Sequence, residues 1–248
     1  MMYDRLIERL DAAVCLSESD KVALRGMKLE YFDVSAGIDL EDAKQFSKMH
    51  MIVAGIACRY KIYKGGNRHI VSLLLPGDLC NGHIPLAHSP GTHIGTLTQC
   101  LVAVLPLPAV QTLIAQHPQI AKALWWNTLL KMSVSHAWIE NMGRCADKRL
   151  AHLICELYVR YEAVGLVQSG SFELDITQGD IGDIVGISAV HVCRVLRKLK
   201  QMQMIWIINK RIGVPSLKRL SEFAEFDPVY LLASPPTSGD CDRLARRR

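Results

Sequence analysis

The feature that most constrains this chain is the order of small, apolar and polar residues within residues 178–197. Gly182 leaves room for two helices to approach closely, and Gly186 suits a turn that needs a positive φ. Apolar residues stand where two crossing helices would bury them: Ile181, Val185, Ile187, Val192 and Val195. This order predicts a helix-turn-helix, in which two helices are joined by a short turn. A generic helical hairpin is the alternative.

Capping residues support both predicted helices. Thr177 and Asp180 form a capping pair for the first helix, and Ser188 caps the second. The second helix would bury Val192, Val195, Leu196 and Leu199, and it would turn outward Ala189, Val190, Cys193, Arg194 and Arg197. A helix exposed in this way can enter the major groove of duplex DNA.

The outward side chains predict particular DNA contacts. Arg194 is placed to bind a guanine edge, a contact worth about 1–3 kcal/mol of discrimination, and Val190 can pack on a thymine methyl group. Ser188 and His191 are expected to contact phosphates. The other expected DNA-contacting residues in this region are Thr177, Gln178, Ala189, Cys193, Arg197 and Lys198. For Cys193, a small packing residue and a redox switch are the two interpretations.

A second, smaller motif follows this helix. Residues 204–208 and 211–214 are apolar enough for two short strands, and Asn209 and Lys210 suit the tight turn between them. The pattern predicts a β-hairpin wing. We expect Lys210 and Arg211 at its tip to face the DNA backbone.

The charge distribution agrees with a polyanionic partner. The formal net charge is +5, and residues 1–143 contain 13 basic and 12 acidic residues while residues 144–248 contain 16 and 12. Residues 188–211 contain six basic residues and no acidic one. A local basic stripe of this kind favours nucleic acid as partner, although a solvated helix face produces the same pattern.

The N-terminal half shows a different pattern. The first 27 residues predict short helices, and residues 28–107 predict strands separated by turns. In one strand we expect Ile56, Cys58, Tyr60 and Ile62 on a single face. Gly65-Gly66 and Pro76-Gly77-Asp78 are the turn signals on either side of the next strand. Regular strands and turns of this kind predict an antiparallel roll or sandwich.

A long helix is expected between the two halves, from Pro118 to about Met142. A helix of this length is about 36 Å long, more than a small domain covers alone. We expect it to be a dimer helix through Leu124, Val134 and Trp138, with an ordinary surface-packed helix as the alternative. Gly143 then offers a hinge before a further helix over residues 146–161.

A β-rich N-terminal domain, a long helix and a winged helix-turn-helix, in this order, resemble the CRP/FNR superfamily of bacterial regulators. The sharpest match is in residues 177–182 and 188–196, and a looser one is in residues 74–79. The Ser-x-Val-His-Val-x-Arg run and residues 226–231 resemble an alphaproteobacterial branch. The resemblance implies an α+β protein with a cyclic-nucleotide-binding-like β-roll. It also implies a homodimer that binds a palindromic site in double-stranded DNA as activator or repressor, with RNA polymerase as partner of an activator.

The resemblance divides the chain into four parts. They are an effector-sensing domain over residues 1–117, a dimerisation helix and hinge over 118–143, a DNA-binding domain over 144–231, and a disordered basic tail over 232–248. One departure concerns DNA: well-known members carry a glutamate in the recognition helix where this chain has Val190, so the usual half-site is not expected.

The sensor domain departs further from its best-known relatives. There is no arginine between Arg68 and Arg144 to hold a cyclic nucleotide phosphate, and before Cys58 the only cysteine is Cys15, too few for a clustered iron–sulfur site. A small-molecule effector of unknown identity is expected, and the sequence requires no cofactor. The expected effector pocket comprises Gly77, Asp78, Leu79, Cys80, His83 and Thr96.

Three alternatives to a ligand-responsive regulator remain. Cys80, His83, His88 and His93 offer soft ligands for a metal or haem. Cys80 and His83 are also the most plausible nucleophile and base of an enzyme, but without a third residue to orient them we assign no catalytic residue. The third alternative is a regulator that needs no ligand.

The chain lacks the marks of membrane insertion or secretion. Its apolar runs are too short to span a bilayer, and its first helix-like segment carries Asp4, Glu8 and Asp11. Eight cysteines without paired spacing suggest reduced thiols. We therefore expect a cytoplasmic protein.

Overall fold

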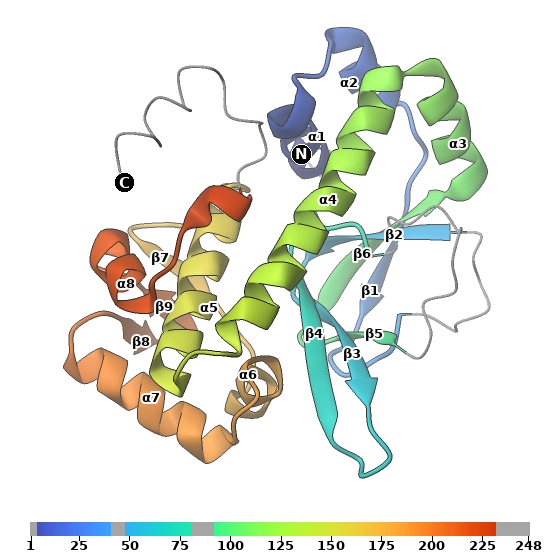
Figure 1. The fold of residues 1–248 in the computed structure, drawn as a ribbon. Helices are drawn as coiled ribbons and strands as arrows, with labels where there is room; N and C mark the ends of the chain where they lie inside the picture. Colours follow the sequence, from blue (N-terminus) through green and yellow to red (C-terminus); the bar gives the residue numbers. More distant parts are fainter. Residues whose placement is uncertain (1–3, 41–47, 81–91, 232–248) are drawn as a thin grey trace.

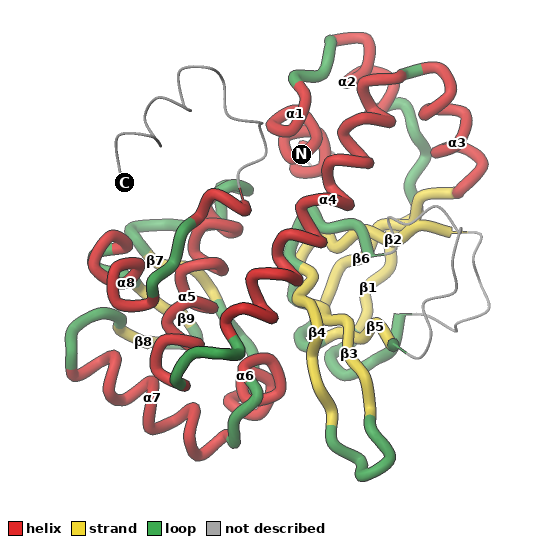
Figure 2. Tube along the Cα trace, in the orientation of Figure 1, coloured by secondary structure: helices red, strands yellow, loops and turns green. Residues whose placement is uncertain are grey.

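The computed structural model describes residues 4–40, 48–80 and 92–231. One long helix, α4 (Pro118–Asn141), runs between a β-rich unit and a mainly helical unit. Figure 1 shows the β-rich unit on the right of α4 and the helical unit on the left, and Figure 2 shows the same division by secondary structure.

Two short helices begin the β-rich unit. They are α1 (Asp4–Val14) and α2 (Glu18–Arg25). Ser17 caps α2 in a capping box with Asp20, because the Ser17 side chain accepts from the Asp20 amide and the Asp20 side chain accepts from the Ser17 amide. Both helices bury leucines in a cluster that also contains the Ile120 side chain of α4.

Six strands form two antiparallel three-stranded sheets. The first has the order β1-β6-β2, and the second β4-β3-β5. The strands are β1 (Glu30–Val34), β2 (Lys48–Ala54), β3 (Ala57–Ile62), β4 (Arg68–Leu74), β5 (His93–Thr96) and β6 (Cys100–Pro106). Side chains of both sheets meet in one cluster, which includes Ile52, Leu74 and Val102. The described strands therefore form the predicted antiparallel β-roll.

The side-chain pattern of β3 differs from the expected alternation. Ala57 and Cys58 are both buried, whereas the Ile62 side chain is exposed. The pairing of β3 with β4 shifts register between Arg59 and Tyr60, as in a β-bulge. The extra residue of this bulge, Val71, lies on β4, so the order of faces along β3 itself is unchanged. Ile62 is exposed at the end of β3, and the expectation that it shares a face with Cys58 stays a prediction.

Helix α3 (Leu107–Gln116) connects β6 to α4. Pro118 occupies the first turn of α4, where a missing amide hydrogen costs nothing. The helix ends at Asn141, and α5 (Ala146–Glu162) begins five residues later. The predicted bounds of both helices are confirmed to within a residue or two. No described helix combines the length and the apolar character needed to cross a membrane.

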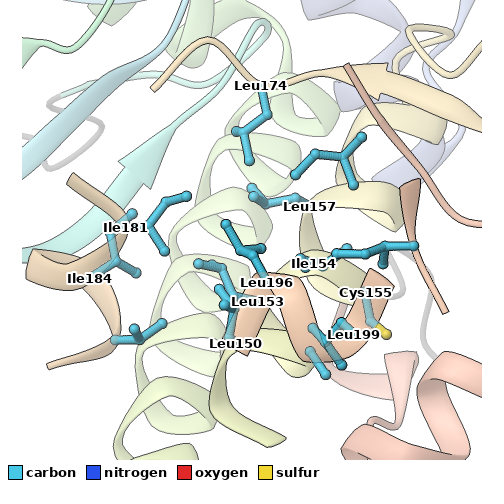
Figure 3. Packing of buried hydrophobic residues seen from close by; sticks show 14 of the residues in the cluster. Leu150, Leu153, Ile154, Cys155, Leu157, Leu174, Ile181, Ile184, Leu196 and Leu199 are labelled. Atoms are coloured by element: carbon cyan, nitrogen blue, oxygen red, sulfur yellow. The ribbon is translucent and has the colours of Figure 1, made fainter. Parts of the chain in front are cut away.

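The helical unit consists of four α-helices and a small antiparallel sheet of order β7-β9-β8, followed by a 3-10 turn, η1 (Pro228–Leu231). Its elements after α5 are β7 (Ser171–Glu173), α6 (Gln178–Val185), α7 (Ala189–Gln201), β8 (Trp206–Ile208), β9 (Arg211–Gly213) and α8 (Leu217–Ala224). Figure 3 shows its core, in which Leu153 and Leu157 of α5 lie among side chains of α6 and α7.

The core of the helical unit continues into the β-roll. Ile70 and Leu73 of β4 belong to the same buried cluster as Ile181 and Ile184 of α6. Arg68 at the start of β4 adds an ion pair to Asp183 of α6, with 2.7 Å between Nε and Oδ2. The two units are therefore in direct contact through β4 and α6.

Candidate nucleic-acid interface and interdomain cavity

The turn between α6 and α7 depends on two glycines. Gly186 ends α6 in the left-handed region, with φ 69° and ψ 41°, and its amide donates to the Gly182 carbonyl at 2.8 Å. A Cβ on Gly182 would overlap the Ile187 carbonyl oxygen. At the other end of α6, Thr177 and Asp180 form a complete capping box. These contacts fix the angle between the two helices.

Helix α7 separates its buried and exposed faces cleanly. Val192, Val195, Leu196 and Leu199 are buried against the core. Ser188 caps the helix by accepting from the His191 amide at 3.3 Å. The opposite face carries the exposed side chains Ala189, Val190, His191, Arg194 and Arg197. In Figure 1, α7 lies along the lower edge of the helical unit.

The structure exposes nearly all residues predicted to contact DNA. Thr177 and Gln178 lie at the start of α6, Ser188 lies at the start of α7, and all three are exposed. Cys193 is only partly exposed. Lys198 pairs with Asp147 of α5, and this contact raises the pKa of the lysine. Among the described residues, neither Arg194 nor Arg197 forms an ion pair, so both guanidinium groups are available.

The wing hairpin is present, and Lys210 and Arg211 both have partners within the chain. Strands β8 and β9 form the expected hairpin, and Asn209 and Lys210 both have positive φ, as its tight turn requires. Lys210 is exposed at the tip and pairs with Asp175 at 2.8 Å. Arg211 instead turns inward, where its guanidinium donates to the Ser171 carbonyl at 3.0 Å. Arg211 thus anchors β9 to β7, and its expected contact with the DNA backbone stays a prediction.

Helix α4 leaves an apolar stripe uncovered. Trp125, Met132 and Ile139 are 64%, 53% and 69% exposed, and they recur every seven residues. Seven residues make about two turns, so these side chains lie on one face of the helix. We call these three residues the α4 stripe.

The α4 stripe is not the set of residues that the sequence pattern indicated. Leu124 packs on the core next to α1, and Trp138 packs on the core of the helical unit. The Trp138 indole also donates to Glu156 at 2.8 Å. Val134 is partly buried beside the interdomain cavity. Leu124 and Trp138 thus pack at least in part within their own chain, and their place in a dimer face stays a prediction.

Asp78, a predicted pocket residue, is the centre of a buried ion network. Its carboxylate binds Arg9 of α1 at 2.6 Å and Arg160 of α5 at 2.8 Å. Arg160 also binds the buried Glu156 at 3.1 Å. Although burial opposes ionisation, the two arginines hold the pKa of Asp78 below its usual value. The network joins the N-terminal helix, the sensor turn and the helical unit.

A cavity of about 590 Å³ lies next to this network, where β4, α4 and α5 meet. Asp78 and Cys80 line it as expected. The other described pocket candidates do not: Gly77 forms a tight turn at φ 91°, Leu79 is in the core, and Thr96 donates to the Ser35 carbonyl at 2.6 Å. These three residues therefore do not line this cavity.

Several residues lie outside what the structure describes, among them His83 and His88. Within the described residues, no group of three metal-binding side chains gathers. His93 instead stacks on Tyr60, with 5.4 Å between ring centroids. Cys80, the suggested nucleophile of the enzyme alternative, is buried.

The sequence did not reveal the cations of the cavity. Arg9, Arg59, Lys131 and Arg160 line it and come from α1, β3, α4 and α5. Arg59 and Arg160 lie on either side of the arginine-free stretch between Arg68 and Arg144, so they are far in sequence from the predicted pocket. The one local signal was the i, i+4 spacing of Glu156 and Arg160.

Comparison with known proteins agrees with this architecture. Residues 148–223 match the Crp-like helix-turn-helix domain. The chain is 26% identical over 181 residues to the transcriptional activator protein FnrL of Cereibacter sphaeroides, covering 71% of this chain and 72% of that protein. It is 23% identical over 181 residues to an anaerobic regulatory protein of Aggregatibacter actinomycetemcomitans, covering 73% and 70%.

A solved structure with the same fold is that of FixK2 from Bradyrhizobium japonicum, with a TM-score of 0.69 and 21% identity over 79% of this chain and 97% of that one. Fold, helix-turn-helix and relatives together define a DNA-binding transcriptional regulator. In this domain and in its fold the chain is similar to regulators of the CRP/FNR superfamily, and the relatives named here are transcription regulators.

Proposed function

We propose that the protein is a cytoplasmic homodimer that binds an inverted repeat in double-stranded DNA through α7 and responds to a small-molecule effector. The observation that carries this proposal is the exposed face of α7, which holds Arg194 and Arg197 and no acidic residue. Two copies related by a two-fold axis would place two such helices in successive major grooves, about 34 Å apart.

The α4 stripe supports the dimer. Three large apolar side chains on one helix face are costly in water, and a second α4 packed against them would remove that surface. The repeat of seven is the spacing with which two helices pack side by side. Because α4 is directly followed by α5, such a dimer also sets the distance between the two α7 helices.

We assign one function to each part of the chain. Residues 1–117 sense the effector, 118–143 dimerise, and 144–231 bind DNA. The basic sequence of residues 232–248 would add non-specific affinity for DNA. If the protein activates transcription, RNA polymerase is a further partner.

Val190 and Arg194 shape the expected half-site. Arg194 is proposed to bind a guanine, and Val190, which is 63% exposed, to pack on a thymine methyl group. Val190 has no hydrogen-bonding group to read a cytosine. We therefore do not expect the half-site to contain a cytosine that a carboxylate at this position would recognise.

Selection of bound fragments from random DNA tests this proposal. The purified full-length protein should enrich an inverted repeat with half-site centres about one helical turn apart, at both low and near-physiological salt. If the ligand-free protein instead bound DNA without sequence preference, and only at low salt, it would not be competent for specific binding. If a panel of metabolites and metal ions then restored no selectivity, the proposal itself would fail.

A further inference from the structure

The cavity between β4, α4 and α5 combines apolar walls with a charged end. Leu73, Val134, Ile139 and Val159 are among its wall residues, and Arg9, Arg59, Asp78, Lys131 and Arg160 gather at one end. A volume of about 590 Å³ is within the range of pockets for small organic ligands.

Positive charge exceeds negative charge at this end of the cavity. Among the described residues, Asp78 is the only carboxylate in the lining, against four cationic side chains. Asp78 is already shared by Arg9 and Arg160, and Glu156 behind the wall binds Arg160. The sequence of residues 81–91, which follows Cys80, contains no aspartate or glutamate.

Two of the cations are therefore held by neutral oxygens. The Lys131 ammonium donates to the Leu79 carbonyl, and Arg59 donates to the Cys80 carbonyl at 2.9 Å and to Thr92 at 3.3 Å. Burial lowers the pKa of Lys131 to about 8. In addition, Nε of Arg9 is buried and has no hydrogen-bond partner within the described part of the chain.

Buried cations that outnumber their counter-ions cost free energy, and a bound anion reduces this cost. We propose that the cavity binds an amphipathic carboxylate, with its carboxylate between Lys131 and Arg9 and its apolar body along Val134, Ile139 and Val159. This inference rests on the proposed function, in which the ligand is the effector.

The same geometry gives the ligand a route to the DNA-binding unit. Arg160 belongs to α5 and binds Asp78 of the sensor turn. A ligand carboxylate at the charged end competes with Asp78 for the cations, and it thereby changes the contact that joins α5 to the β-roll. Ile139 belongs both to the cavity wall and to the α4 stripe, so a second copy of the chain would close the open side of the cavity.

Octanoate is a suitable probe. Its two halves are tested separately: 1-octanol has the apolar chain without the carboxylate, and acetate has the carboxylate without the apolar chain. Calorimetric titration of the full chain at pH 7 should detect octanoate binding, and neither half should bind comparably. Lys131→Met should weaken octanoate binding at least ten-fold, or about 1.4 kcal/mol. Lys131→Arg, which keeps the charge, should retain it. Lys122→Met, which removes an exposed lysine of the same helix, should bind like the wild type.

Three results would overturn the inference. They are the absence of octanoate binding, equal binding of octanoate and 1-octanol, and undiminished binding by a folded Lys131→Met variant. Because the titration contains no DNA, its outcome is independent of the fragment selection. If the protein selected an inverted repeat but did not bind octanoate in the titration, amphipathic carboxylates would be excluded as ligands and the proposed DNA-binding function would stand.

Discussion

Single residues determine whether the helix-turn-helix can form, and Gly182 is the clearest case. Its position in α6 faces the Ile187 carbonyl across the turn, where any Cβ would overlap the oxygen. Because the clash is with backbone, it cannot be relieved by rotating a side chain. The sequence spacing predicted a small residue at this point, and the structure supplies the physical reason.

Gly182→Ala should therefore destabilise the protein, by about 1–3 kcal/mol as for other overpacked sites. Urea unfolding of the full chain measures the change. Gly179→Ala is the matched control, since its Cβ would meet only the Thr177 hydroxyl oxygen at 3.4 Å. If both variants unfolded at the same urea concentration, the close approach at Gly182 would not be what fixes the turn.

His152 makes stability depend on pH. It is buried beside Phe226 and Tyr230, and burial lowers its pKa to about 4 from an ordinary 6.5. The unfolded chain therefore binds a proton more readily than the folded one. The stabilisation is complete above pH 6.5 and declines as the pH falls toward 4.

When the pH is lowered from 7.5 to 5, this histidine should reduce the free energy of unfolding by about 2 kcal/mol. His152→Phe should remove that part of the pH dependence, and His191→Phe, at an exposed site, should not. Urea unfolding at the two pH values decides between the outcomes. The same pH slope in His152→Phe and wild type would contradict the assignment.

At the scale of elements, α4 has two apolar faces with different roles. One packs on the β-roll and the helical unit, and the other is the α4 stripe. Because the helix is apolar on several sides, sequence spacing alone selected the packed face through Leu124 and Trp138. Only the packing of the neighbouring elements shows which residues remain exposed.

Ile139→Asp should shift the protein from dimer to monomer, because it places a charge in the proposed interface. Sedimentation equilibrium measures the mass directly. Val22→Asp is the matched control, since Val22 is 63% exposed on α2 and does not belong to the stripe. A dimeric Ile139→Asp protein would mean that another surface joins the two copies.

The contact between β4 and α6 is a second feature at this scale. Arg68 binds Asp183 at 2.7 Å and also pairs with Asp180, which has a separate role in capping α6. Substitution of Asp183 therefore tests the contact between the two units and leaves the capping residue Asp180 in place. Since the Arg68 side chain is 33% exposed, solvent screening keeps its contribution modest.

A double-mutant cycle with Arg68→Ala and Asp183→Ala should give a coupling free energy of about 0.5–1 kcal/mol in urea unfolding. The same cycle with Lys64→Ala and Asp183→Ala should give none, because Lys64 lies exposed in the turn beyond β3. Additive effects in the first cycle would show that the ion pair does not couple the two units.

At the scale of the whole molecule, local patterns were predictable and contacts between distant segments were not. The fold order, the two caps and the turn at Gly186 follow from residues close together in the sequence. The network around Asp78 joins Arg9, Asp78 and Arg160, which come from three distant segments. No periodicity links such residues, so the sequence identified Asp78 as a pocket residue without its partners.

Arg194 is the residue through which selection of DNA sequence by α7 can be measured. For the inverted repeat selected by the wild type, we predict that Arg194→Ala loses about 1–3 kcal/mol of preference over scrambled DNA. Lys200→Ala should instead weaken binding to both DNAs equally and lower the salt dependence. Fluorescence anisotropy at two salt concentrations measures both ratios. An unchanged preference in Arg194→Ala would contradict the account.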